Sequence, residues 1–178
     1  MAKSVPVDQL AGVLPGSTLR PFTAADLAEL VVLQRCCWVS EAILNSTLDI
    51  PALHENHDEV LAWATSWTTV VVRVEGRLVA AVRGRQEGAS WEIGRLMVAP
   101  DLAGRGIGSR LLAAIESLAP AGVSEFVLFT GARSLRNIAL YERAGYRLTD
   151  PPDPNGTSHI SGAVFLAKPR TTGPTQIC

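Results

Sequence analysis

The fold is decided by residues 96–112, LMVAPDLAGRGIGSRLL. The stretch opens with an apolar run typical of a buried strand and closes with Leu111 and Leu112, which share one helical face with Ile115 and Leu118. Three glycines lie between these parts, at positions 104, 106 and 108. A strand that turns into a helix through glycines gathers unpaired backbone N–H groups and the positive end of the helix dipole. The stretch therefore predicts a mixed α/β fold with a site for a phosphate-bearing ligand.

Two common phosphate-binding motifs do not fit this turn. The dinucleotide pattern GxGxxG fails because Ser109 stands at the third glycine position, and the P-loop fails because no Gly-Lys-Ser/Thr follows. Neither NAD nor a nucleoside triphosphate is favoured. Glycines also occur in ordinary strand-to-helix connections, so the turn alone leaves a purely structural role equally open.

The flanking sequence predicts strands and helices in mixed order without an internal repeat. Thr23 offers an N-cap before a helix that continues to Gln34, and Pro51 interrupts a second helical region. The turn at residues 75–77 separates two β-branched runs and indicates a hairpin. The expected strands are 17–21, 68–74, 78–84, 91–98, 126–129, 146–148 and 163–167, and the expected helices are 23–34, 41–50, 58–66, 109–118 and 134–144.

Composition indicates one globular domain. The chain has 178 residues, with 47% hydrophobic and 19% charged residues. Its 16 basic and 17 acidic residues leave a net charge of −1, so direct nucleic-acid binding is not expected. Segments rich in turn-forming residues flank the domain. We expect an N-terminal arm at 1–16, the domain at 17–169 and a flexible tail at 170–178.

The three cysteines are Cys36, Cys37 and Cys178, and their spacing matches no zinc motif. We expect free thiols, with the adjacent pair packed in the core, a catalytic thiol being the alternative. No metal site is expected. The N-terminus lacks the apolar run of a signal peptide, and no stretch approaches the ~20 apolar residues of a membrane span. These features predict a cytoplasmic protein without membrane contact.

Two motifs together resemble the GCN5-related N-acetyltransferase (GNAT) superfamily. Residues 96–100 (LMVAP), 106–108 (GIG) and 111–112 (LL) resemble its coenzyme A-binding motif, and residues 137–146 (NIALYERAGY) resemble its later motif of an Asn, a Tyr one turn on and a Gly-aromatic pair. The resemblance covers about residues 91–147. One position departs from it, because Ala103 stands where the family usually has Gln or Arg; Arg105 is a candidate to compensate.

The resemblance implies a central, mostly antiparallel twisted sheet flanked by helices, with strands splayed at the coenzyme A site. It implies transfer of an acetyl group from acetyl-CoA to a primary amine of a small molecule, peptide or protein N-terminus, by direct attack in a ternary complex. Transfer of another acyl group and a non-catalytic acyl-CoA sensor are the alternatives. Homodimers are common among such proteins.

The resemblance also implies roles for individual residues. Tyr141 is expected to donate a proton to the departing thiolate. Glu92 is a candidate base, because an amine with a pKa of ~10.4 costs about 4–5 kcal/mol to deprotonate at pH 7; a solvent-facing carboxylate is the alternative. The residues expected to contact the coenzyme are Met97, Val98, Ala103, Gly104, Arg105, Gly106, Ile107, Gly108, Ser109, Asn137 and Tyr141.

The acceptor is expected between residues 38–58 and the loop at 150–162, the regions that line the acceptor site in this superfamily. Charge and an aromatic face make Trp38 and Glu41 candidates for binding a cationic amine, together with Asp49, His54 and Glu55. A solvated acidic surface explains the charges equally well. His159 is a candidate second base in the loop.

Overall fold

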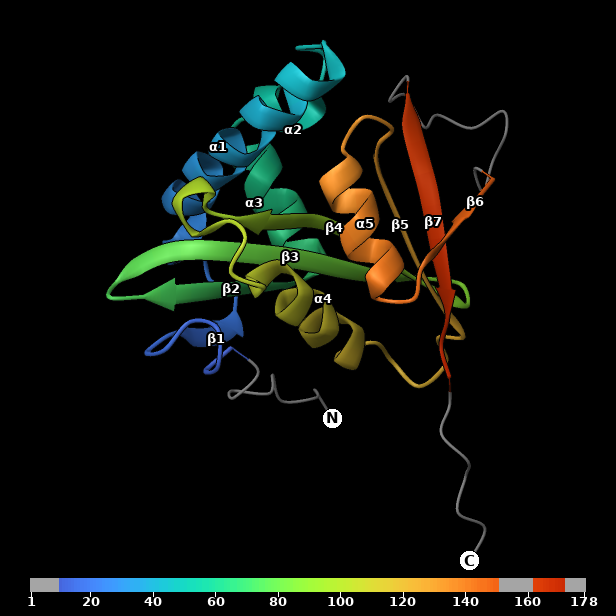
Figure 1. The fold of residues 1–178 in the computed structure, drawn as a ribbon. Coiled ribbons are helices and arrows are strands. Elements are labelled where there is room, and N and C mark those ends of the chain that lie inside the picture. The colour runs from blue at the N-terminus through green and yellow to red at the C-terminus, as the bar shows by residue number, and fades with distance from the viewer. Residues whose placement is uncertain (1–9, 151–161, 172–178) are drawn as a thin grey trace, which may run out of the picture.

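The computed structural model describes residues 10–150 and 162–171, which form a seven-stranded sheet with helices on both faces (Figure 1). The strand order is β1-β2-β3-β4-β5-β7-β6, and every neighbouring pair is antiparallel except β4 and β5. This confirms the mostly antiparallel sheet. The strands are β1 (Thr18–Pro21), β2 (Thr68–Val74), β3 (Arg77–Glu87), β4 (Ser90–Val98), β5 (Glu125–Gly131), β6 (Arg147–Thr149) and β7 (Ala163–Pro169).

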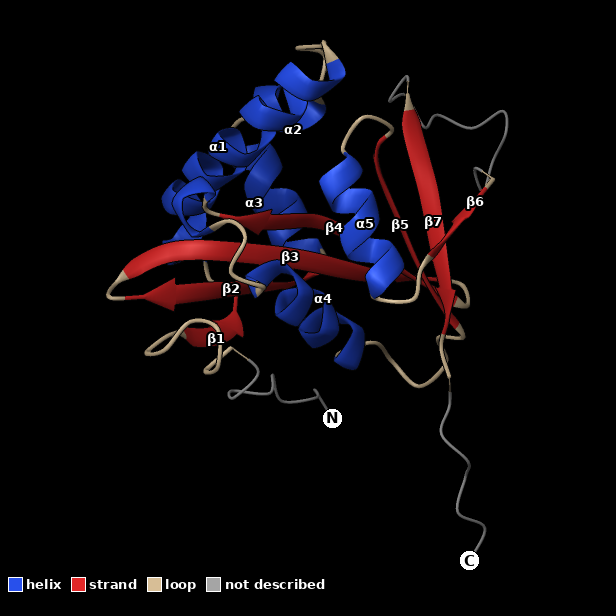
Figure 2. Ribbon diagram, viewed as in Figure 1, coloured by secondary structure: helices blue, strands red, loops and turns tan. Residues whose placement is uncertain are grey.

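The helices form the outer layers. They are α1 (Leu27–Asn45), α2 (Pro51–His54), α3 (His57–Ser66), α4 (Ile107–Ser117) and α5 (Leu135–Arg143), with short 3-10 helices η1 (Ala24–Asp26) and η2 (Pro100–Leu102). Helix α3 lies behind the sheet and α4 in front of it (Figure 2). In β3, residues 78–82 are at most 4% exposed. Five consecutive buried residues in one strand require cover on both faces.

The hairpin between β2 and β3 forms as predicted. Its two turn residues, Glu75 and Gly76, both have positive φ, at 49° and 82°. Two positive φ angles match the right-handed twist of the flanking strands.

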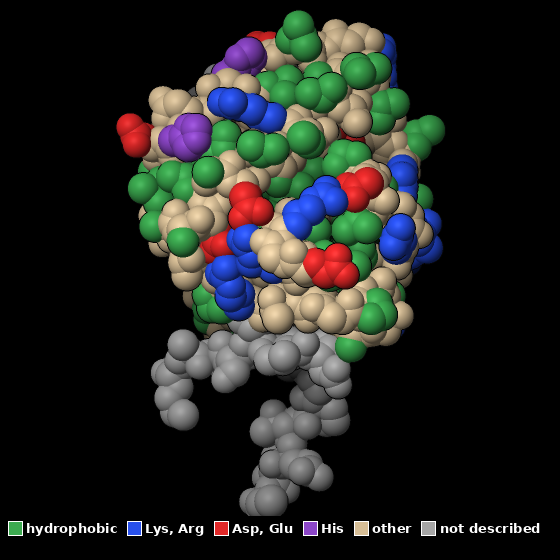
Figure 3. Space-filling view, turned by 90° about the vertical axis from the view of Figure 1, so that its left-hand side faces the viewer, with side chains coloured by type: hydrophobic (Ala, Val, Ile, Leu, Met, Phe, Trp, Pro, Cys, Tyr) green, Lys and Arg blue, Asp and Glu red, His purple; other side chains and the backbone are tan. Residues whose placement is uncertain are grey.

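Helix α1 differs from the prediction, because it runs unbroken past Gln34 to Asn45. It exposes Val32, Val39 and Ile43 by 61%, 50% and 73%. Hydrophobic side chains also lie among charged ones on the face of the molecule in Figure 3. The mixed outer surface of α1 weakens the periodicity from which a helix is recognised.

Leu10 and Leu14 belong to the hydrophobic core and are 1% and 6% exposed. Part of the segment expected as an arm thus packs against the domain. Within 10–150 and 162–171, none of the helices has the length and apolar character needed to cross a membrane.

Asp26 is the centre of a buried ionic network beside β1. Its carboxylate, 1% exposed, accepts two hydrogen bonds of 2.7 Å from Arg20, one of 2.8 Å from Arg73, and two of 2.9 Å from Thr23. Hydrogen bonds from Arg20 and then Thr23 hold the pKa of Asp26 well below its ordinary value. The network joins β1 and β2 to the start of α1.

We predict that Asp26→Asn lowers the free energy of unfolding by about 1.5–3 kcal/mol at pH 7, because it removes a buried carboxylate that accepts charged hydrogen bonds from Arg20 and Arg73. A depressed folded pKa stabilises the fold above the unfolded value of ~3.9, and this contribution disappears as pH falls through the folded pKa. The difference from wild type, measured by urea unfolding, should therefore shrink below about pH 4.

The control is Asp101→Asn, which breaks an Arg–Asp pair of similar geometry between Arg77 and Asp101 at the surface. Its effect should be much smaller, because solvent screens exposed pairs. Equal effects of the two variants would contradict the role of the Asp26 network.

Candidate functional site

Strands β4 and β5 pair over three residues and then separate. Only residues 90–92 pair with residues 125–127, although β4 continues to Val98 and β5 to Gly131. Beyond this contact β4 contains a bulge, in which Arg95 and Leu96 oppose the single residue Val82 of β3. Arg95 has a φ of 51°, in the left-handed region. This confirms the predicted splay, which leaves the β5-facing edge of β4 without a strand partner in the described part of the chain.

A cavity of about 690 Å³ occupies this opening. Its walls come from α1, β4, the glycine turn, β5 and α5. Phe129, expected in a buried strand, is 41% exposed and lines the cavity because β5 has lost its neighbour there. The residues expected from sequence that line it are Trp38, Glu41, Val98, Ala103, Gly104, Gly106, Ile107, Gly108, Ser109, Asn137 and Tyr141.

The glycine turn forms one end of the cavity. Gly104 and Gly106 have φ of 88° and 80°, and Gly106 is the N-cap of α4, two residues earlier than expected. Among the described residues no side chain caps this helix, and its first turn carries no acidic residue. Its first N–H groups therefore have no partner within the helix. A Cβ on Gly108 would lie 3.2 Å from Leu140 Cδ1, so a side chain would fill the gap between α4 and α5. These features fit a bound phosphate.

Strand β4 presents backbone to the cavity. The side chain of Met97 is 1% exposed and points into the core, whereas Val98 lines the cavity. The carbonyl of Val98 accepts a hydrogen bond from Cys37 Sγ at 3.3 Å. Met97 is not among the residues that line the cavity, and its buried side chain leaves only its main chain for a contact there.

Tyr141 and Asn137 lie on α5 beside Glu41 of α1. Tyr141 lines the cavity and is 8% exposed. Burial, and then the charge of Glu41, raises the pKa of Tyr141 above its usual range, so it stays a neutral phenol at physiological pH. Glu41 accepts hydrogen bonds from Asn137 Nδ2 at 3.0 Å and from Ser134 Oγ. The sequence reasoning missed Ser134, which gives no signal without the position of α1.

Glu92 lies outside the cavity lining. It occupies the last position at which β4 still pairs with β5, and Arg85 Nη2 donates to its carboxylate at 2.8 Å. Its role as a base remains a prediction. Arg105 is exposed at the turn.

The other acceptor candidates are distributed around α2. His54 is exposed and its Nε2 lies 2.8 Å from the carbonyl oxygen of Leu48. Glu55 is half-buried and pairs with Arg95. Asp49 is exposed. His159 lies outside the described residues.

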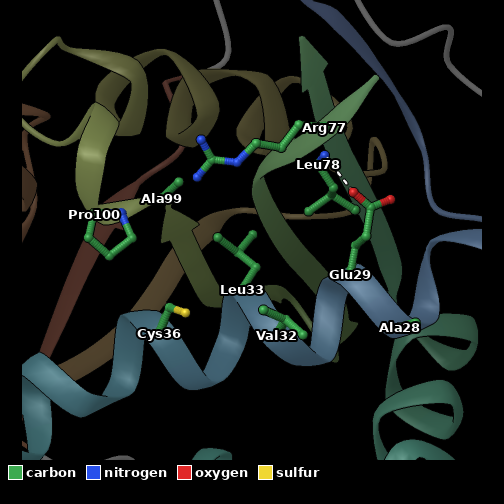
Figure 4. Close-up of a pocket in the computed structure, with 9 residues that line it drawn as sticks. All are labelled: Ala28, Glu29, Val32, Leu33, Cys36, Arg77, Leu78, Ala99 and Pro100. Atoms are coloured by element: carbon green, nitrogen blue, oxygen red, sulfur yellow. Dashed lines mark hydrogen bonds between the residues drawn. The ribbon is translucent and has the colours of Figure 1, made fainter. Parts of the chain in front are cut away.

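A second, smaller hollow of about 310 Å³ lies along α1, beside the start of β3 and the end of β4 (Figure 4). Its lining is mostly apolar and includes Val32, Leu33 and Pro100, and Glu29 there accepts a hydrogen bond from the backbone N–H of Leu78 at 3.1 Å. It contains none of the residues expected to act on a ligand.

The adjacent cysteines differ from the expected pair of core residues. Cys36 is exposed, so that expectation is wrong for it, and Cys37 is half-buried. Burial raises the pKa of Cys37 to about 12. Within the described ranges, no group of three or more His, Cys, Asp or Glu side chains is placed to hold a metal ion.

Residues 29–146 match the model of the Acetyltransferase (GNAT) family, and the chain belongs to this family. An IAA acetyltransferase of Azospirillum brasilense is 37% identical over 103 residues, which are 56% of this chain and 66% of that protein. A mycothiol acetyltransferase of Clavibacter sepedonicus is 33% identical over 139 residues, 74% of this chain and 43% of that protein. The chain thus spans less than two-thirds of each relative.

Solved structures share the fold. The paia N-acetyltransferase of Thermoplasma acidophilum, in complex with coenzyme A, has a TM-score of 0.72 at 15% identity, covering 86% of this chain and 99% of that one. The ribosomal-protein-S18-alanine N-acetyltransferase of Escherichia coli has a TM-score of 0.65 at 18% identity, covering 91% and 99%.

We predict that iodoacetamide at pH 8 alkylates Cys36 but reacts with Cys37 far more slowly. The thiolate is the reacting species, and a pKa near 12 makes its fraction on the order of a thousandfold smaller than for an ordinary thiol of ~8.5. The measurement is labelling rate by mass spectrometry in a Cys178→Ser background. Cys36→Ser and Cys37→Ser are the matched controls, and equal rates at both positions would contradict the prediction.

Proposed function

We propose that the chain is an acetyl-CoA-dependent N-acetyltransferase that moves an acetyl group directly to a primary amine in a ternary complex. The observation that carries this proposal is the opening between β4 and β5, with the uncapped start of α4 at one end. Its volume of about 690 Å³ falls in the ~300–1,000 Å³ range of small-molecule sites. The neighbour from Thermoplasma acidophilum, solved with coenzyme A, supports the same ligand.

In this proposal the chain binds the coenzyme mainly through its backbone. The N–H groups of residues 104–109 bind the pyrophosphate, where glycines allow close approach. An N–H of Met97 or Val98 polarises the thioester carbonyl. Acetyl-CoA supplies the activated acetyl group.

The side chains at the opening supply proton transfer. The Tyr141 phenol, protonated because of its raised pKa, donates a hydrogen bond to the sulfur as the C–S bond breaks. Glu92, directly or through a water relay, accepts the proton that the attacking amine loses. In this proposal Glu41, which lines the cavity, attracts the amine by its charge. An acyl-CoA sensor is the alternative that Ala103 favours, whereas Tyr141 in the cavity favours an enzyme.

The donor site is tested by calorimetric titration of acetyl-CoA. Wild type should bind, and Gly108→Val should weaken the affinity at least about tenfold, or ~1.4 kcal/mol, because the side chain fills the gap beside Leu140. The control Gly12→Val adds the same bulk where a Cβ meets nothing within 4 Å. Absence of binding by folded wild type well above micromolar concentrations would refute the proposed function.

Tyr141→Phe and Glu92→Gln should each lower kcat by about 10²-fold or more, the usual contribution of a positioned acid or base. The measurement is coenzyme A release with a turned-over amine, alongside the Kd of acetyl-CoA, which should stay unchanged. Glu87→Gln is the control for Glu92, because Glu87 also pairs with Arg85 but is 72% exposed. Unchanged kcat in either variant removes that residue from the mechanism.

A further inference from the structure

Two arginines and three tryptophans form a cluster beside the cavity, on the α1 and α3 side of the sheet. The Arg83 guanidinium of β3 lies 4.0 Å from the ring centroid of Trp67 and 4.6 Å from that of Trp63. The Arg95 guanidinium, in the β4 bulge, lies 5.0 Å from the ring of Trp38. Aromatic faces attract guanidinium cations but do not provide hydrogen-bond acceptors for the guanidinium N–H groups.

The carboxylate beside this cluster is already engaged. Glu55 binds Arg95 Nη2 at 2.5 Å through one oxygen. Its other oxygen accepts from Gln34 Nε2 at 2.9 Å and from Trp63 Nε1 at 3.1 Å. Glu55 is therefore held to Arg95 and forms an ion pair with only one of the two guanidinium groups.

Arg83 forms no ion pair within 10–150 or 162–171, although the charges of Glu55 and Glu92 act on it from beyond ion-pair distance. Its Nε is buried without a hydrogen-bond partner there, as is Nε of Arg95. Burial, and then the charge of Arg95, lowers the pKa of Arg83 to about 9, so it remains a cation at pH 7. A buried cation without an anionic partner is costly, and a bound anion would relieve that cost.

The cluster borders the cavity through Trp38 and Arg95, which line it. Gly94 pairs with Arg83 across the strands, and a Cβ there would lie 3.3 Å from Arg83 Nε and 3.8 Å from Nη2. Gly94 and Arg95 both line the cavity. Arg83 is not itself among the lining residues, but its guanidinium lies against Gly94, which has no side chain and does line the cavity.

We propose that the acceptor amine carries a carboxylate, bound by Arg83 and Arg95, so that amino acids are the substrate class. This inference rests on the proposed acetyltransferase function. Planar guanidinium groups match carboxylates in geometry and charge. Arg95 lies two residues before Met97, whose backbone is one candidate to polarise the thioester, so the proposed carboxylate site and the reacting group lie along the same part of β4.

The test measures coenzyme A release, by chromatography, with L-amino acids and with their carboxamides. Wild type should prefer the acid by at least about tenfold in kcat/KM, since a charge-assisted hydrogen bond is lost with the amide. The comparison is stringent because an amino amide has the larger fraction of neutral, nucleophilic amine. A site without anion recognition would favour the amide.

Arg83→Gln should raise KM for the acid at least about tenfold, leaving kcat, the amide reaction and acetyl-CoA affinity close to wild type. Arg83→Lys keeps the positive charge but lacks the planar guanidinium group, so its effect on KM should be intermediate. If thermal melting shows that Arg83→Gln is unfolded, Arg83→Lys replaces it in the test. Arg77→Gln removes an exposed cation from the same strand and is the control.

The inference is overturned if amides react as well as acids, if Arg83→Gln slows both alike, or if acetyl-CoA binds and no amino acid is acetylated. Failure of wild type to bind acetyl-CoA would instead reject the proposed function, so the two failures are distinguishable.

Discussion

The limited pairing of β4 with β5 is the constraint on which the site depends. Three residue pairs join the strands at one end, and the bulge at Arg95 and Leu96 turns β4 away from the line of β5. A parallel pair needs a crossover connection, and α4 supplies it. The same divergence therefore creates the cavity and brings the start of α4 to its edge.

The sheet consists of two parts, β1-β2-β3-β4 and β5-β7-β6, which pair directly only between β4 and β5. Because this pairing is so short, the two parts need another connection. Glu116 of α4 provides it, accepting hydrogen bonds from Lys168 of β7 at 2.6 and 2.7 Å and from Tyr146 at 2.8 Å. Helix α4 also packs on β3 and β4. On the opposite side of the cavity, Glu41 joins α1 to α5. Polar contacts to helices thus hold the opening at a defined width.

Sequence could predict the parts of the site that depend on neighbours along the chain. The glycine turn at 104–108 and the spacing of Asn137 and Tyr141 are local patterns, and both lie at the cavity as expected. The arginine cluster depends instead on cross-strand register. Arg83 faces Gly94 only because of the pairing of β3 with β4, and its tryptophan partners are Trp63 of α3 and Trp67, which directly follows that helix. No periodicity in the sequence carries that information.

The direction in which a side chain points is the other property that the sequence could not predict. Glu92 was a reasonable candidate by position, but its pairing with Arg85 and the place where the strands separate depend on the folded sheet. Likewise, Phe129 is exposed because β4 is absent beside it. Hydrophobicity alone would bury it.

The buried leucines at positions 10 and 14 bear on how far the folding unit extends. The family match covers residues 29–146, yet the core also includes Leu10, Leu14 and Leu166. A fragment trimmed to the matched region would lose Asp26, β1 and β7, and β5 would keep only its three pairs with β4. The region of sequence similarity includes the residues around the cavity. The cooperative folding unit that keeps these residues in place extends beyond that region toward both termini.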